Sequence, residues 1–302
     1  MRTPEPLEHR VGELERECVE LRRRLEVVYT SKSWRLTAPL RRVAALARTR
    51  TATSPAPGPG HGDAAPAEDP GFPPARLRER VAGTPDLDWF KESARTAIED
   101  IADALGDCGR SLSDFTRIYD FGCGCGRLTL PLAARLGADR ITATDSDADA
   151  TAWLAARLPR ARVETNPTLP PLAFADDEFD LIIGWSVFTH LPEDYQDAWL
   201  AELARVLRPD GMMLQTVHGP TSFDRVGAAA DDPVRNALPV EGFIYYENHG
   251  PDSPFEAYYQ TSFHHPDYIR RHWSQWFEVV EIRPGLARPS HDMVVLAPRG
   301  PA

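Results

Sequence analysis

The residues with the clearest potential for chemistry are one carboxylate and three glycines within seven positions. Asp120 is followed by Gly122, Gly124 and Gly126, after a short apolar run that predicts a strand entering a turn. Because glycine has no side chain, this turn leaves backbone N–H groups and bare Cα atoms beside whatever binds there. Several nucleotide-binding folds use such a loop, so the loop by itself predicts a binding turn and no particular ligand.

A second carboxylate, Asp145, lies nineteen residues beyond Gly126, at the end of the next predicted strand. A carboxylate at this place can accept hydrogen bonds from both hydroxyl groups of a ribose. The alternative role is to cap the following helix, which Ser146 or Asp147 could fill instead. With the glycine loop present, we favour the ribose role.

Cys123 and Cys125 lie inside the glycine loop, and such a pair invites a metal or redox interpretation. The four cysteines of the chain have neither zinc-site spacing nor the density of a disulfide scaffold. We therefore interpret the pair as small residues that fit the loop, predict no metal site, and expect a reducing, cytoplasmic location.

The elements that must position these residues alternate between strand and helix. An alternation of this kind predicts a parallel sheet with helices on both faces and a ligand at the carboxyl ends of the strands. Two closing strands joined by a short turn predict an antiparallel pair, and residues 219–262, rich in Gly, Pro and aromatics, predict an inserted substrate-side region. Strands are predicted at 117–121, 141–145, 161–165, 180–185, 212–217, 277–282 and 293–297, helices at 76–105, 127–136, 147–158, 193–207 and 266–276, and turns at 208–211 and 284–285.

The D-x-G-x-G-x-G spacing at 120–126, together with Asp145, resembles the class I S-adenosylmethionine (SAM)-dependent methyltransferases. Residues 166–180, of the form N-x-x-x-P-P-L-x-F-x-D-x-x-F-D, and residues 186–191 and 199–211 resemble a bacterial methyltransferase-domain family. The resemblance covers about 115–218, and the C-terminal part more loosely. It implies an α/β, Rossmann-like class I methyltransferase fold, with a seven-stranded, mostly parallel sheet whose last strand is antiparallel, and SAM as the cofactor.

The resemblance also implies a set of cofactor contacts. Asp120 would accept a hydrogen bond from the ammonium group of SAM, directly or through water, and Asn166 would edge the adenine. A NAD-dependent dehydrogenase is the alternative for the loop, but it would need G-x-G-x-x-G, and here the third glycine comes one residue early. The predicted cofactor-binding residues are Asp120, Gly122, Cys123, Gly124, Gly126, Asp145, Ser146, Asn166 and Ser186.

The helix predicted at 76–105 precedes the first strand, where class I methyltransferases commonly carry helices that cover the cofactor cleft. Its aromatic residues Trp89 and Phe90 are therefore either parts of a lid or members of the core.

The candidate catalytic bases are histidines expected at the carboxyl end of the sheet. They are His190 after the fourth predicted strand, His218 after the fifth, and His264 or its neighbour His265 before the helix at 266–276. Methyl transfer from a sulfonium is an in-line displacement, and an alcohol acceptor must also lose its proton. The order of preference is His264, His218 and then His190, although each could instead brace its own loop. His264 stands beside aromatic residues that could stack on a sugar or ring, namely Phe243, Tyr245, Tyr246, Tyr258 and Tyr259.

Residues 1–30 carry apolar residues at alternating spacings of four and three, which predicts a coiled-coil helix. A helix this short is stable only when paired, so a homodimer, another partner or the protein's own body would cover it. The apolar positions are Leu7, Val11, Leu14, Cys18, Leu21, Leu25 and Val28.

Residues 31–50 form a basic amphipathic segment with six Lys or Arg between Lys32 and Arg50 and no acidic residue. Such a segment is either a solvated helix or a surface for anionic lipid or a docking partner. It resembles a segment attached to bacterial glycosyltransferases of cell-surface polysaccharide assembly, which implies association with the membrane or with a glycosyltransferase complex. The resemblance lies in Ser31, Ser33, Trp34, Arg35, Leu36, Pro39 and Leu40.

Residues 51–74 contain seven prolines and predict a disordered linker, so the methyltransferase domain is expected at 75–302. The net charge of −11 hides a split, with +5 on residues 1–50 and −13 on residues 75–302. An acidic body is a poor surface for a phosphate backbone, so we expect no nucleic-acid partner. No apolar run reaches the roughly 20 residues that cross a bilayer, and the N-terminus lacks the apolar core of a signal peptide.

These observations predict a SAM-dependent methyltransferase that methylates an oxygen of a sugar or glycan precursor for the cell surface. Its location would be cytoplasmic, or peripheral at the inner face of the membrane. The alternatives are a small-molecule methyltransferase of secondary metabolism and a non-catalytic protein that acts through its N-terminal coiled coil.

Overall fold

A computed structural model of the chain describes residues 69, 71–225, 232–246, 256, 258–287 and 291–300. These residues belong to one compact unit, Glu68–Ala302. The predicted coiled-coil helix (1–30), the basic segment (31–50) and all but the last few residues of the linker (51–74) lie outside the described residues.

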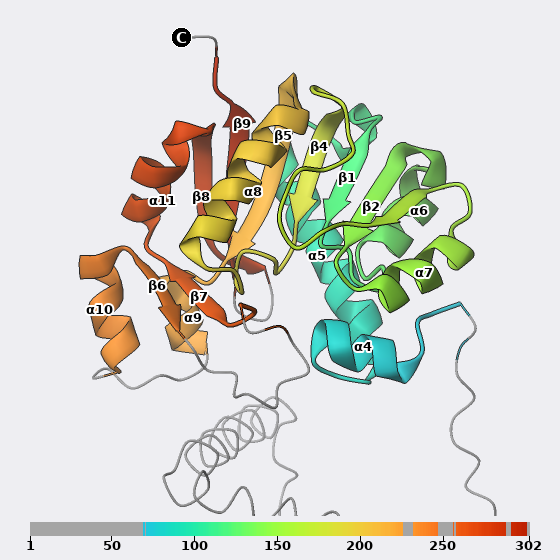
Figure 1. Ribbon diagram of the computed structural model, residues 1–302, viewed down its shortest axis with the longest axis horizontal. Coiled ribbons are helices and arrows are strands. Elements are labelled where there is room, and N and C mark those ends of the chain that lie inside the picture. The colour runs from blue at the N-terminus through green and yellow to red at the C-terminus, as the bar shows by residue number, and fades with distance from the viewer. Residues whose placement is uncertain are drawn as a thin grey trace, which may run out of the picture. The chain divides into compact units, whose positions relative to one another are not determined.

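The centre of the protein is a seven-stranded sheet with the order β3-β2-β1-β4-β5-β9-β8 (Figure 1). The first five strands in the chain run parallel, and β9 pairs antiparallel with both β5 and β8. The predicted antiparallel last strand is therefore confirmed, and it lies between the fifth strand and its own hairpin partner. The bounds are β1 Ile118–Phe121, β2 Ile141–Asp145, β3 Arg162–Thr165, β4 Phe179–Gly184, β5 Leu207–Val217, β8 Phe277–Ala287 and β9 His291–Pro298.

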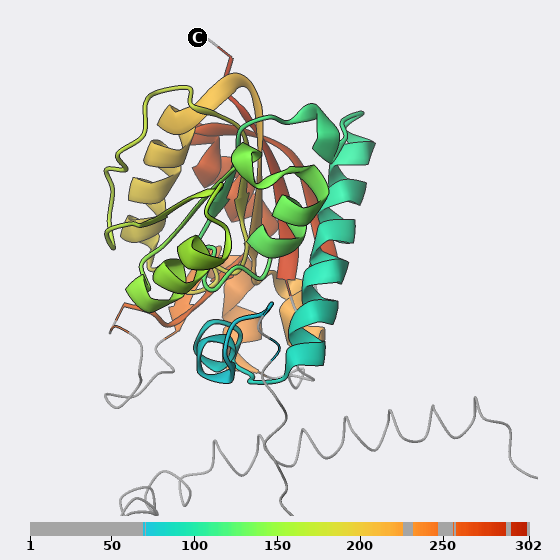
Figure 2. The same ribbon diagram turned by 90° about the vertical axis from the view of Figure 1, so that its right-hand side faces the viewer.

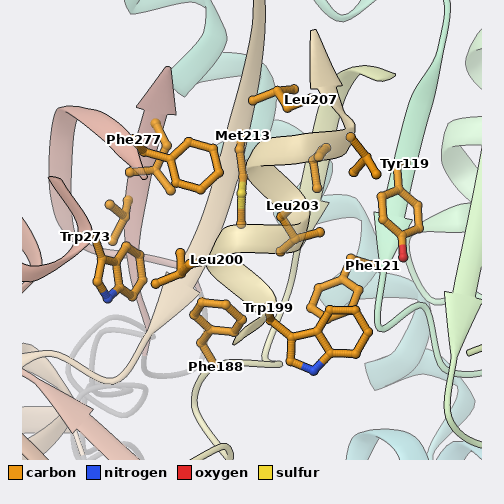
Figure 3. Close-up of a cluster of buried hydrophobic side chains, with 14 of the residues drawn as sticks. Tyr119, Phe121, Phe188, Trp199, Leu200, Leu203, Leu207, Met213, Trp273 and Phe277 are labelled. Carbon is orange, nitrogen blue, oxygen red and sulfur yellow. The ribbon is translucent and has the colours of Figure 1, made fainter. Parts of the chain in front are cut away.

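Side chains alternate between two buried layers because successive residues of a strand point to opposite faces of the sheet. On β5, Met213 packs on one face with helices α8 (Glu193–Val206) and α11 (Pro266–His272), in the cluster of Figure 3. Its neighbours Met212 and Leu214 pack on the other face with α5 (Leu87–Asp107) and α6 (Thr129–Leu136). Since both faces are covered, the central strands read as continuous apolar runs in the sequence.

The single helix predicted at 76–105 is wrong, because two helices occupy this stretch. Helix α4 (Ala75–Ala82) ends at Gly83, whose φ of 72° is left-handed, and α5 begins after Asp86. The Asp86 carboxylate accepts hydrogen bonds from the N–H groups of Asp88 and Trp89, which caps the new helix. The break lets α4 turn under the end of the sheet where the glycine loop lies (Figures 1 and 2).

Two further boundaries differ from the sequence prediction. The turn predicted at 208–211 lies inside β5, where the pairing with β4 shifts between Phe179 and Leu181 and the extra residues form an irregularity. The helix predicted at 266–276 ends at His272 and continues as a 3-10 turn, Trp273–Gln275. Tertiary contacts set both boundaries. Pairing with β4 extends β5 over the predicted turn, and burial of Trp273 accompanies the end of α11.

The inserted region after β5 contains regular structure that its irregular sequence did not predict. It holds α9 (Pro220–Arg225), α10 (Pro233–Glu241) and a small antiparallel sheet of β6 (Phe243–Tyr246) and β7 (Thr261–His264). Around β7, the N–H of Gln260 donates to His190, that of Ser262 to Thr189 and that of His264 to His218. The insert is thus bonded to the loops that follow β4 and β5, at the carboxyl end of the sheet.

Helix α7 (Ala148–Arg157) follows β2, and its Leu154 packs on Ala143.

Among the residues that the structure describes, no helix has the length and apolar character needed to cross a bilayer.

Candidate active site

A cavity of about 670 Å³ lies at the carboxyl ends of the parallel strands. Its walls come from the glycine loop after β1, the loops after β2, β3 and β4, helix α4, and the insert. Seven of the nine predicted cofactor residues line it: Asp120, Gly122, Cys123, Asp145, Ser146, Asn166 and Ser186. Gly124 and Gly126 do not appear in its lining, and of the three candidate histidines only His190 does.

The glycines of the loop allow both its conformation and its packing. Gly122, Gly124 and Gly126 have φ values of 73°, 53° and 91°, in the left-handed region that side chains disfavour. A Cβ on Gly122 would overlap the side chain of Val187, and a Cβ on Gly124 would overlap Val81 of helix α4. The missing side chains therefore make room for two neighbouring protein segments, a role that the sequence pattern alone did not indicate.

Asp120 is a buried carboxylate at the floor of the cavity, with an exposed fraction of 1%. The hydroxyl of Thr129 donates to its Oδ2 at 2.6 Å. Burial is the main cause that raises the pKa of Asp120 to about 6. A cation placed against this carboxylate would offset the burial, so the position suits an ammonium group.

Asp145 is held by two main-chain donors. Its Oδ2 accepts from the N–H of Gly124 at 2.7 Å, and its Oδ1 accepts from the N–H of Asp147 at 2.9 Å. The helix cap is Asp147, which accepts from the N–H groups of Asp149 and Ala150. Since each carboxylate oxygen has two lone pairs, Asp145 keeps acceptor capacity toward the cavity, which suits a pair of ribose hydroxyls.

Asn166 presents an unsatisfied acceptor at the cavity wall. Its Nδ2 donates to the main-chain oxygen of Pro167 at 2.7 Å, which fixes the orientation of the amide. Its Oδ1 is buried and has no hydrogen-bond partner among the described residues. A buried acceptor without a partner costs free energy, so the site suits a ligand that donates there, as the amino group of an adenine does.

Ser186 follows β4 with a left-handed φ of 62°, uncommon for a residue with a side chain. Its N–H donates to the Thr216 hydroxyl at 2.7 Å, and this bond holds the strained turn. Ser186 and Ser146 both line the cavity, so the predicted contacts from the four loops converge on one space.

These features together fit S-adenosylmethionine, which has an ammonium, a carboxylate, a ribose diol and an adenine. The carboxylates of Asp120 and Asp145 and the unpartnered amide oxygen of Asn166 line one cavity. When bound, the cofactor supplies a methyl group on a positively charged sulfur.

The two cysteines of the loop are buried and have thiols of raised pKa. Burial raises the pKa of Cys125 to about 12 and that of Cys123 well above its usual range. Thiols of this kind stay protonated near neutral pH and are poor nucleophiles. Among the described residues no group of three or more His, Cys, Asp or Glu has a metal-binding arrangement.

His190 lies in the loop after β4, at the wall of the cavity. Its Nδ1 lies 2.8 Å from the main-chain oxygen of Gln260. A carbonyl oxygen only accepts hydrogen bonds, so Nδ1 carries the proton and Nε2 is the unprotonated nitrogen of the neutral ring. The ring stacks on Tyr259 of the insert, with 4.2 Å between ring centroids.

The preference for His264 over the other histidines does not agree with its position. His264 is fully buried, is absent from the cavity lining, and packs among Phe243, Tyr268 and Trp273. Its Nε2 bonds to Oε1 of Gln196 at 2.8 Å, and burial lowers its pKa to about 3. The pairing of β7 with β6 turns this side chain toward the core, so it is a structural histidine.

His218 is also absent from the cavity lining. Its ring lies between Phe263 and His291, with centroid separations of 5.6 Å and 5.0 Å. Burial lowers the pKa of His218 to about 4, so the ring is neutral near neutral pH. The ring of His218 stacks on that of His291 and does not line the cavity.

The structure brings one further histidine to the site, His291, which the sequence analysis did not identify. His291 begins β9 and lines the cavity, with its Nε2 3.5 Å from the Ser186 hydroxyl. An antiparallel strand begins at the edge of the sheet where the parallel strands end. The residues just before the predicted strand at 293–297 could therefore have been placed at the site.

Helix α4 and the start of α5 cover the cofactor side of the cavity. Trp89 lines the cavity and is half-buried, whereas Phe90 is buried beside Leu77 and Cys125. Arg80 of α4 donates to Asp147 at 2.8 Å, which joins the cover to the amino end of α7. Of the two aromatic residues considered for a lid, Trp89 faces the cavity and Phe90 belongs to the core.

The match to one protein family supports this assignment. Residues 118–211 match the protein family described as a methyltransferase domain. Among solved structures, the chain is similar to 1,6-didemethyltoxoflavin-N1-methyltransferase from Burkholderia thailandensis, with 20% identity, 80% of this chain and 94% of that chain covered, and a TM-score of 0.49. It is also similar to magnesium protoporphyrin IX methyltransferase from Synechocystis, with 15% identity, coverage of 74% and 94%, and a TM-score of 0.47.

The family match includes the glycine loop, Asp145, Asn166 and the first residues of the long β5. The sheet order and the antiparallel β9 agree with the fold that the resemblance implied. The chain is therefore an S-adenosylmethionine-dependent methyltransferase with a Rossmann-like class I fold.

Proposed function

We propose that this enzyme methylates a hydroxyl oxygen of a sugar or glycan precursor used in cell-surface polysaccharide synthesis. The observation that carries the oxygen acceptor is the hydrogen bond from His190 Nδ1 to the main-chain oxygen of Gln260. It leaves Nε2 of a cavity-lining histidine as the nitrogen that can take a proton. A sugar hydroxyl is too weak an acid to ionise near neutral pH, so its attack on the methyl group needs such a base.

In this proposal, the residues that line or form the cavity have the following roles. Asp120 holds the ammonium of the cofactor, Asp145 accepts from its ribose, and Asn166 accepts at the adenine edge. The loop residues Gly122, Cys123, Gly124 and Gly126 form the turn around its amino-acid part, and Ser146 and Ser186 complete the wall. His190 takes the proton of the acceptor hydroxyl, and His291, which also lines the cavity, orients that hydroxyl.

Aromatic rings at the acceptor end support a ring-shaped acceptor. Tyr258 and Tyr259 of the insert and Trp185 after β4 line the cavity, and Tyr259 is fixed by its stacking on His190. Flat apolar faces of this kind can lie against a sugar ring while polar groups select its hydroxyls.

The glycan context rests on the resemblance of residues 31–40 to segments of polysaccharide glycosyltransferases. It carries with it a cytoplasmic or membrane-peripheral location and a partner complex or homodimer formed through residues 1–50.

The test is to incubate the full chain with SAM carrying a ¹³C-labelled methyl group and a set of nucleotide sugars and polysaccharide precursors. We expect a labelled O-methyl sugar, identified by its NMR shift and by mass spectrometry. Transfer to a nitrogen or carbon atom would contradict the oxygen acceptor. Turnover of a secondary metabolite, with no turnover of any sugar, would favour the small-molecule alternative.

A further inference from the structure

The indole of Trp185 carries an unsatisfied hydrogen-bond donor at the cavity. Trp185 directly follows β4, is 5% exposed and lines the cavity. Its Nε1 is buried and has no hydrogen-bond partner among the described residues. An indole N–H can only donate, so it needs an atom with a free lone pair.

The protein side of this indole supplies no such atom. Trp185 belongs to the buried apolar layer that the sheet forms with α5 and α6. In the sheet register it stands beside Thr216, because Gly184 pairs with Gln215. The Thr216 hydroxyl instead accepts from the N–H of Ser186 at 2.7 Å. A partner for the indole N–H must therefore come from the cavity.

Two other buried tryptophans show what is particular to Trp185. Trp199 also lines the cavity, but its Nε1 donates to the main-chain oxygen of Thr168 at 3.2 Å. Trp273 has a buried Nε1 with no partner among the described residues, but it packs in the core and does not line the cavity (Figure 3). Of these three side chains, Trp185 combines an unsatisfied N–H with a place in the cavity wall.

We propose that the Trp185 N–H binds a neutral carbonyl oxygen of the acceptor, such as that of the acetamido group of an N-acylated amino sugar. A hydroxyl in this place would accept the bond but leave its own O–H against the apolar layer. A carboxylate would bring a charge to the same layer at a larger cost. A carbonyl oxygen has lone pairs and neither a hydrogen nor a charge. The proposal rests on the proposed function, a sugar acceptor, and narrows that acceptor to a chemical class.

Calorimetric titration of the full chain saturated with S-adenosylhomocysteine tests the contact. UDP-N-acetylglucosamine and UDP-glucose differ only in carrying an acetamido group or a hydroxyl at one carbon, and UDP-N-acetylgalactosamine and UDP-galactose form a second pair. In at least one pair, the wild type should bind the acetamido sugar about 10-fold more tightly. Trp185→Phe keeps an apolar ring and removes the N–H, so it should reduce this preference to about twofold or less.

Trp273→Phe is the matched control, because it removes an equally unsatisfied indole N–H outside the cavity. It should keep the wild-type preference. Both variants should bind S-adenosylhomocysteine within about twofold of the wild type. A measurement on the ¹⁵N-labelled wild type needs no variant: the indole N–H resonance of Trp185 should move when the preferred acetamido sugar is added and stay in place with its hydroxyl counterpart.

Equal affinity of the wild type for both sugars of each pair overturns the proposal, and so does a preference that persists in Trp185→Phe. A loss of S-adenosylhomocysteine affinity in Trp185→Phe would assign the N–H to the cofactor and overturn it as well. A preference that Trp185→Phe removes, without methylation of any sugar, would instead contradict the proposed function and leave this contact standing.

Discussion

His190 and Gln260 are joined by two hydrogen bonds, although 70 residues separate them in the sequence. The Gln260 N–H donates to the main-chain oxygen of His190 at 3.0 Å, and Nδ1 of His190 donates to the main-chain oxygen of Gln260 at 2.8 Å. The insert thus fixes both the position and the tautomer of a histidine from the loop after β4. In the proposed role of His190 as the base, this restraint lowers the entropy cost of reaching the working geometry.

His190→Asn tests this role with little change in structure. The amide nitrogen of Asn can replace Nδ1 as the donor to Gln260, whereas nothing replaces Nε2. We expect kcat to fall about 10²- to 10⁴-fold and the affinity for S-adenosylhomocysteine to stay within about twofold. Steady-state kinetics and calorimetry measure the two. His272→Asn, outside the cavity, is the control. Full activity in His190→Asn together with loss in His291→Asn would move the base to His291.

The pKa of Asp120 gives a stability prediction with a definite sign. Burial raises this pKa from 3.8 to about 6, so ionisation of Asp120 opposes folding. The cost is complete above pH ~6 and absent below pH ~4. Asp120→Asn should therefore be more stable than the wild type at pH ~7.5, by up to ~3 kcal/mol, and the difference should shrink as the pH falls. Urea unfolding at several pH values measures it.

Asp120 should have the opposite effect on cofactor binding. If its carboxylate holds the ammonium of the cofactor, S-adenosylhomocysteine should bind less tightly as the pH falls through about 6. The Asp120→Asn variant should bind weakly and lose that pH dependence. An identical pH profile in variant and wild type would contradict the ammonium contact.

Gly124 and Gly109 form a matched pair for testing the contact with helix α4. Both have a left-handed φ, 53° and 70°, but a Cβ on Gly109 meets nothing within 4 Å, whereas one on Gly124 overlaps Val81. Substitution by Ala costs about 1 kcal/mol of backbone strain at each site, and Gly124→Ala should cost a further ~1–3 kcal/mol. Adding Val81→Ala should recover most of the extra cost. Equal destabilisation of the two alanine variants would show that α4 does not press on the loop.

Asp145 is expected to contribute most of its free energy to ligand binding. Saturating S-adenosylhomocysteine should raise the melting temperature of the wild type, by linkage of binding to folding. Asp145→Ala should lose most of that rise because two hydroxyl donors of the ribose lose their acceptor. The variant also frees the N–H groups of Gly124 and Asp147, so its unliganded melting temperature is the reference. A full ligand-induced rise in the variant would remove Asp145 from the ribose site.

Residues 1–50 are expected to bring the enzyme to the membrane or to a membrane-bound partner. The full chain should fractionate with membranes, and a truncated chain beginning at Ala75 should not, since it lacks the basic amphipathic segment. High salt should release the full chain if the attraction is electrostatic. Equal partitioning of the two chains would exclude this role.

The sequence determined the class of fold, and it predicted which loop residues line the cavity, because those features are local. A strand, a glycine turn and a helix are adjacent in the chain, and the end of each parallel strand meets the same edge of the sheet. Asp120, Asp145, Asn166 and Ser186 could therefore be assigned to one cavity from their positions after strands. The alternation of strands and helices likewise predicted the parallel sheet and its antiparallel end.

Only the tertiary structure decided which histidines line the cavity, because their positions depend on pairings between distant segments. The register of β7 against β6 turns His264 into the core, and the antiparallel entry of β9 brings His291 to the cavity. The break at Gly83 directs Val81 onto Gly124, a contact that no spacing in the chain encodes. Histidines alike in sequence context thus differ in role, since burial and hydrogen-bond partners, and not position after a strand, fix which ring can accept a proton.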